Sequence, residues 1–124
     1  MLRLGLVVLG VTDMDRAIAF WSAALGYVPR AGAASPTWTT IDPADGQPGT
    51  PIGLELSESP LQDHPRMHLD LQVATAAEQR AETARLQALG ATVVDWDLYP
   101  PDPDFIVLAD PEGNRFCIVD ESHG

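Results

Sequence analysis

The two halves of this 124-residue sequence contain the same order of predicted elements. The first half begins with the apolar run Leu2 to Val11, which is typical of a buried strand. A helix then starts after Thr12 or Asp13 and ends at Gly26, as a helix with a capping side chain and a left-handed terminal glycine would. Three short strands are predicted to follow, near residues 27–30, 38–41 and 52–57.

The second half repeats this order from the strand RMHLDLQV, residues 66–73. A helix over residues 76–89 stops at Gly90 and carries one alanine stripe, and strands are predicted over residues 91–96, 105–109 and 115–119. The stripe consists of Ala77, Ala81, Ala84 and Ala88. The turns DPADG at 42–46 and DPEGN at 110–114 occupy equivalent places, so we predict two copies of a βαβββ unit.

Each copy has about half the length that a self-sufficient core needs, so the two should share one sheet surface or pair with a second chain. We predict a single domain of the α+β class, with module one at 1–57, a connector at 58–65 and module two at 66–124. The expected architecture is an eight-stranded, open, cup-shaped mixed sheet with the helices on its outer face. A ligand should then bind on the concave face.

The composition restricts the class of partner. The formal charge of −11 would repel nucleic acid phosphates and anionic lipid surfaces, so neither is expected to bind. A single cysteine excludes an internal disulfide framework, and the apolar N-terminal run is too short to span a bilayer. We therefore expect a cytoplasmic protein whose partner is a small-molecule ligand or substrate.

The strand MHLDLQV, residues 67–73, places His68, Asp70 and Gln72 on one face. This row is either a metal and substrate site or a solvated strand face. Cys117 shares a face with Arg115 in the last predicted strand and could approach His68 as a nucleophile, although a free cysteine is more often a small buried apolar residue.

Aromatic side chains are predicted to form either the walls of the cup or part of the core: Trp38, Trp96, Tyr99 and Phe105. The proline-rich stretch DLYPPDPD, 97–104, is interpreted as a loop over the mouth of the cup or as a rigid connector. Among basic residues, Arg66 and Arg115 are the candidates for contacts with an anion.

Three motifs, VTDMDRAIAFWSAALGY, MHLDLQV and DPEGNRFCIV, resemble the vicinal oxygen chelate superfamily, the group of glyoxalases, bleomycin resistance proteins and extradiol dioxygenases, and within it the short glyoxalase-like members. The resemblance implies a homodimer or paired modules and, in the metalloenzymes, a divalent ion held from the first and last strand of each module. The matching positions are Leu6, Glu55, His68 and Cys117. A shift of 62 residues, which aligns Leu6 with His68 and Glu55 with Cys117, gives the same positions.

Only Glu55 and His68 are good ligands for such an ion, because Leu6 cannot coordinate and Cys117 offers a soft thiolate where the family has a carboxylate. Our first hypothesis is therefore a drug-binding, resistance-type or degenerate protein that binds an apolar or aromatic molecule with no metal cofactor. The residues expected to contact this molecule are His68, Asp70, Gln72, Trp38, Trp96, Phe105 and Arg115.

Two catalytic alternatives stay open. One is a metal-dependent lyase, isomerase or dioxygenase that uses Ni, Zn, Fe or Mn bound by Glu55 and His68, with Glu55 also acting as base. The other is a metal-free enzyme in which Cys117, His68 and Asp70 react with the substrate.

Overall fold

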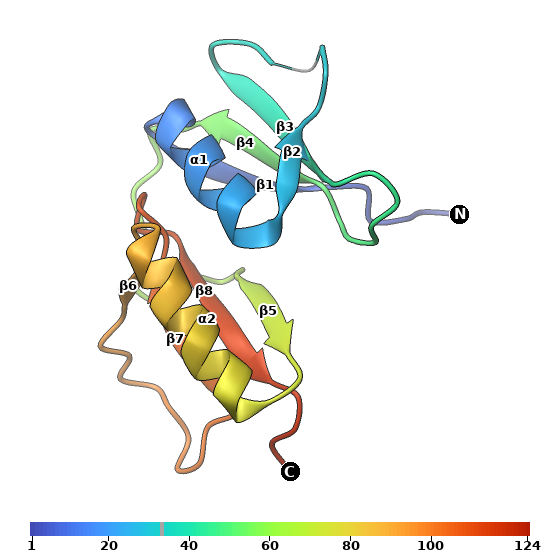
Figure 1. Ribbon diagram of the computed structural model, residues 1–124. Helices are drawn as coiled ribbons and strands as arrows, with labels where there is room; N and C mark the ends of the chain where they lie inside the picture. The colour runs from blue at the N-terminus through green and yellow to red at the C-terminus, as the bar shows by residue number, and fades with distance from the viewer. Residues whose placement is uncertain (33) are drawn as a thin grey trace. The chain divides into compact units, whose positions relative to one another are not determined.

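The computed structural model describes residues 1–32 and 34–124, and the chain divides into two units, Met1–Pro60 and Leu61–Gly124 (Figure 1). Each unit contains a strand, a helix and three more strands, so the predicted α+β class and the two βαβββ copies are confirmed. Hydrogen bonds join the eight named strands into two four-stranded mixed sheets. None of the helices in the described parts of the chain is long and apolar enough to cross a membrane.

The first unit forms a sheet in the order β1-β4-β3-β2. Its elements are β1 (Val7–Val11), α1 (Met14–Leu25), β2 (Tyr27–Pro29), β3 (Trp38–Pro43) and β4 (Ile52–Leu56). The Asp13 side chain caps α1 by accepting a hydrogen bond from the amide of Arg16, and Gly26 ends the helix with a φ of 69°. The inner side of α1 buries Phe20 and Trp21 against this sheet.

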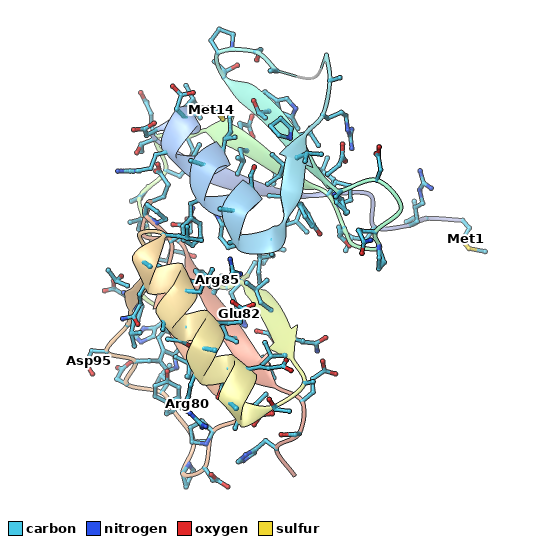
Figure 2. The ribbon with its side chains drawn as sticks, viewed as in Figure 1. Met1, Met14, Arg80, Glu82, Arg85 and Asp95 are labelled. Atoms are coloured by element: carbon cyan, nitrogen blue, oxygen red, sulfur yellow. The ribbon has the colours of Figure 1, made fainter. Side chains whose placement is uncertain are left out.

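The second unit forms a sheet in the order β5-β8-β7-β6. Its elements are β5 (Leu69–Val73), α2 (Ala76–Ala88), β6 (Thr92–Val93), β7 (Phe105–Ala109) and β8 (Arg115–Asp120). The Thr75 side chain caps α2 by accepting from the amide of Glu78. Along this helix Glu82 and Arg85 form an ion pair (Figure 2).

The alanine stripe of α2 faces solvent and not the sheet. The alanines at 77, 81, 84 and 88 are all exposed, and the helix meets its sheet through the opposite side. There Leu86 is buried, and the Gln79 amide donates to the backbone oxygens of Asp104 and Ile118 at 3.0 and 2.9 Å. Alanine buries little apolar surface, so one larger side chain and two hydrogen bonds decide which side faces inward.

The first strand of each unit is shorter than predicted. β1 begins at Val7, whose partner Ile52 is the first residue of β4, and Leu2 and Leu4 before it are 98% and 74% exposed. β5 likewise begins at Leu69, not at residue 66. A strand needs a hydrogen-bonded neighbour, and the ladder between β1 and β4 begins only at Val7, after most of the apolar residues at the N-terminus.

Strand register corrects the alignment of the two modules. Val7 pairs with Ile52 and its equivalent Leu69 pairs with Phe116, so the last strands are offset by 64 residues (52 to 116), not 62. The counterpart of Cys117 is therefore Gly53, and the counterpart of Glu55 is Val119. A two-residue difference keeps the face of a strand, so Glu55 and Gly53 still point to the same side of β4.

Candidate ligand-binding site

A hollow with a volume of about 430 Å³ opens on the face of the second sheet away from α2. Alternation along β8 directs Arg115, Cys117 and Val119 into it, while Ile118 packs on the helix side. The described residues that line it are Pro65, His68, Asp70, Trp96, Leu98, Asp104, Phe105, Val107, Arg115, Phe116, Cys117 and Val119.

Three adjacent strands fix the centre of this site. In the parallel register Asp70 on β5 pairs with Cys117 on β8, and Cys117 pairs in turn with Val107 on β7. Two residues away on the same two strands, Phe105 on β7 pairs with Val119 on β8. The hydrogen-bonded ladder therefore places a carboxylate, a thiol and an aromatic wall next to one another on a rigid surface.

His68, Asp70 and Cys117 form a compact polar cluster. Their ligand atoms, one nitrogen, one oxygen and one sulfur, all lie within 4.8 Å of one another. His68 Nε2 lies 3.0 Å from Asp70 Oδ1, and both side chains are about half exposed, whereas Cys117 is 7% exposed. This cluster offers three different donors to a metal ion or to polar groups of a ligand.

Burial raises the pKa of the Cys117 thiol to about 11, and the neighbouring Asp70 carboxylate adds to the shift through its charge and a hydrogen bond. The group is therefore a neutral thiol near pH 7. Thiolate is the nucleophilic form of cysteine, so this environment is the opposite of what a cysteine nucleophile requires. The raised pKa thus disfavours the metal-free catalytic interpretation, while the expected approach of Cys117 to His68 is present, with their ligand atoms within 4.8 Å of each other.

The rim of the hollow is built around Trp96. The His64 ring lies edge-on to it at 5.1 Å between centroids, and the Arg115 guanidinium carbon lies 5.9 Å from the ring centroid. His64 Nε2 is 2.7 Å from Asp97 Oδ1, and this hydrogen bond is the main cause of a lowered pKa of the Asp97 carboxyl. The Trp96 ring is thus held by neighbours on the connector and on β8.

The proline-rich loop 97–104 contributes directly to the site. Leu98 and Asp104 line the hollow, and the Tyr99 hydroxyl accepts a hydrogen bond of 2.8 Å from the backbone amide of Val107. The Tyr99 and Phe105 rings lie 5.2 Å apart. This loop is therefore fastened to β7 beside the hollow.

Sequence reasoning missed half of the lining. Val107 and Val119 could have been found by counting two residues from Phe105 and Cys117 along their strands. Leu98 and Asp104 carry no such signal because a loop has no side-chain period. The remaining two missed positions are Pro65 and Phe116.

Of the predicted positions in the second unit, Arg66, Gln72 and Tyr99 are not among the described residues that line this hollow. Gln72 lies on β5, exposed and paired with Val119, and Leu6, Trp38 and Glu55 belong to the first unit. The Trp38 ring covers the place on the first sheet that corresponds to the polar cluster: a Cβ built on Gly53 would lie 2.7 Å from the ring and 3.0 Å from Leu6. Glu55 pairs with Trp38 on the same face.

Comparison with known proteins places the chain in a family. The model of the glyoxalase-like domain matches residues 6–119. A glyoxalase/bleomycin resistance protein/dioxygenase family enzyme from Burkholderia phytofirmans PsJN is 21% identical with a TM-score of 0.75, over 96% of this chain and 98% of that one. A glyoxalase-related enzyme from Fulvimarina pelagi is 18% identical with a TM-score of 0.71, over 98% and 89%.

The fosfomycin resistance protein FosX from Listeria monocytogenes, solved as a mutant with Mn(II) and 1S,2S-dihydroxypropylphosphonic acid, is 19% identical with a TM-score of 0.73, over 96% of this chain and 90% of that one. No curated protein sequence matches the chain. At these identities the solved structures establish the fold, while the family match spans nearly the whole sequence. The predicted resemblance is therefore confirmed, and the chain belongs to the glyoxalase-like domain family of the vicinal oxygen chelate superfamily.

Proposed function

We propose that this protein binds a small apolar or aromatic molecule in the hollow of its second unit. The observation that supports this proposal is a hollow of about 430 Å³ in which aromatic and aliphatic walls meet a few polar groups. Small-molecule sites typically have volumes of roughly 300–1,000 Å³ and this same mixture of side chains. Trp96 and Phe105 would stack against the ligand, and the His68–Asp70 pair would orient its polar end.

Substitution of the aromatic wall tests the proposal. Calorimetric titration with an uncharged aromatic amide such as cinnamamide should show saturable binding, which Trp96→Leu and Phe105→Leu weaken at least several-fold. Val93→Ala is the matched control, because Val93 lies on β6, is 47% exposed and does not line the hollow. Equal affinities in all four proteins would place binding outside the hollow and contradict the proposal.

A second candidate function is a metal-dependent lyase, isomerase or dioxygenase. The observation that favours it is the cluster of His68, Asp70 and Cys117, whose donor atoms lie within 4.8 Å of one another. A mixed nitrogen, oxygen and sulfur set fits zinc better than manganese, which prefers oxygen. Glu55 remains a predicted further ligand and base on β4.

In this candidate a bound ion would supply Lewis-acid stabilisation of vicinal oxygens on a substrate. His68 would hold the ion through a ring nitrogen, and Asp70 would add an oxygen. Cys117, whose pKa is about 11, would have to release its proton on binding, so affinity should rise with pH.

Elemental analysis of protein purified without chelator separates the two candidates. Stoichiometric metal that disappears in His68→Ala but persists in His123→Ala would support the metalloenzyme and contradict binding without metal. His123 is the control because it lies at the C-terminus and contacts Asp102. Protein that stays metal-free after supplementation with Ni, Zn, Fe and Mn would exclude the metalloenzyme.

We also propose that the protein forms a homodimer and that its binding partner is a small molecule. Light scattering coupled to gel filtration should give twice the mass of the chain, and a monomer at all concentrations tested would contradict it.

A further inference from the structure

Arg115 is the one guanidinium among the described residues that line the hollow. Its side chain is 23% exposed, and one of its nitrogens reaches Asp63 Oδ1 at 3.4 Å. The guanidinium carbon also lies 5.9 Å from the Trp96 ring centroid. The charge is thus mostly withdrawn from water, beside an aromatic wall.

The Asp63 partner satisfies this guanidinium poorly. A guanidinium has five N–H donors in a planar fork, and a charge-assisted hydrogen bond to a carboxylate normally measures about 2.7–2.9 Å. The 3.4 Å contact is a single long one, and the Asp63 side chain is 91% exposed. An ion pair with one partner so exposed contributes little to stability and is easily exchanged for another.

The two carboxylates of the lining do not fill this role. Asp70 is engaged with His68 at 3.0 Å and with the Cys117 thiol. Among the described residues, Arg115 forms its ion pair with Asp63, which lies outside the lining, and its charge also acts on the Asp97 carboxylate, which is hydrogen-bonded to His64. The fork of Arg115 therefore has donors to spare at the edge of an apolar hollow.

We propose that Arg115 binds the carboxylate of an aromatic carboxylic acid, and that Asp63 is a placeholder that the ligand displaces. The inference rests on the proposed function, because it names the class of molecule that enters the same hollow. Both oxygens of a carboxylate match the guanidinium fork, and the ring of the ligand lies against Trp96 and Phe105. Asp63 competes for the same donors and keeps the charge partly paired while the hollow is empty.

The test compares three probes of one shape: cinnamate, cinnamamide and cinnamylamine, titrated calorimetrically. Cinnamate should bind at least about 10-fold more tightly than cinnamamide, since charge-assisted hydrogen bonds are roughly twice as strong as those between neutral groups. Arg115→Gln should weaken the binding of cinnamate far more than the binding of cinnamamide, and so remove this preference. Arg115→Lys, which keeps the charge without the fork, should give an intermediate preference and guards against misfolding of the glutamine variant.

The variant Asp63→Asn tests whether Arg115 binds the ligand, because a purely structural role of Arg115 would not change the affinity for cinnamate in this variant. Removal of the competitor should tighten cinnamate binding by about 2- to 5-fold, in line with the weakness of an exposed ion pair, and leave cinnamamide unaffected. Asp102→Asn is the matched control, because it removes the same charge from an 86% exposed side chain that pairs with His123. If both variants gain the same affinity for cinnamate, the effect comes from the change in net charge, and Asp63 does not compete with the ligand for Arg115.

The other outcomes are equally decisive. Equal affinity for cinnamate and cinnamamide, or a preference for cinnamylamine that Arg115→Gln does not change, would overturn this inference and leave the proposed function intact. Binding of none of the three probes would count against both.

Discussion

The indole ring of Trp38 lies over Gly53, so close that a Cβ on this glycine would be 2.7 Å from the ring. The indole nitrogen donates to the Thr40 hydroxyl at 3.2 Å, which fixes the ring in this position. Register makes Gly53 the counterpart of Cys117, so a tryptophan in the first unit covers the surface that carries a thiol in the second. The two modules share a fold and differ in chemistry.

Gly53→Ala should therefore displace the Trp38 ring and break its hydrogen bond to Thr40. We expect a loss of about 1–3 kcal/mol in the free energy of unfolding, as for other overpacked cores, together with a change in tryptophan fluorescence. Gly5→Ala is the control, since a Cβ there meets nothing within 4 Å. Equal stabilities of the two variants in urea unfolding would show that the ring adapts without cost.

The pKa of Cys117 gives a prediction about pH. Because the pKa is about 11, the thiolate absorbance of the folded protein, taken as the difference from Cys117→Ser, should appear only with a midpoint near that pH. The stability gained by keeping this thiol protonated is present below the ordinary thiol pKa and is lost as the pH rises towards 11.

Asp70→Asn should lower this midpoint, because it removes the charge and the hydrogen bond that Asp70 contributes. Burial, the larger cause, remains, so the midpoint should stay above the ordinary thiol value. A midpoint that does not move in Asp70→Asn would mean that burial alone sets the pKa.

Local signals were sufficient to predict much of this fold. Gly26 ends α1 as predicted, and Asp13 is the one of the two predicted caps, Thr12 and Asp13, that the structure shows. Both signals act within a few residues of chain. The extent of β7, Phe105–Ala109, was also predicted residue for residue. The family motifs then predicted the correct fold class for these elements.

Features that depend on distant partners could not be predicted in this way. The two extra residues between β5 and β8 moved the counterpart of Cys117 from Glu55 to Gly53, and only the hydrogen-bonded register reveals that shift. Leu98 and Asp104 reach the hollow through the path of an irregular loop, which side-chain periodicity does not describe.

The inward side of α2 gives a further prediction. Gln79→Ala removes both hydrogen bonds from the helix to the backbone of Asp104 and Ile118, and should cost about 1–3 kcal/mol in the free energy of unfolding. Ala84→Lys on the exposed stripe should change it by less than about 0.5 kcal/mol. The reverse order of effects would indicate that the alanine stripe is covered in solution.

The hydroxyl of Tyr99 should matter for both stability and binding. It accepts the amide of Val107, a residue that is 2% exposed, so Tyr99→Phe leaves a buried N–H without this partner and should cost about 1–3 kcal/mol. Hydrogen exchange at Val107 should speed up, and cinnamamide should bind more weakly, because the loop that carries Leu98 loses its attachment to β7. Tyr27→Phe is the matched control: the Tyr27 hydroxyl donates to the Thr50 carbonyl of the first unit, so the same atom is removed away from the hollow. If both variants keep the affinity for cinnamamide, the Tyr99 hydrogen bond stabilises β7 without shaping the site.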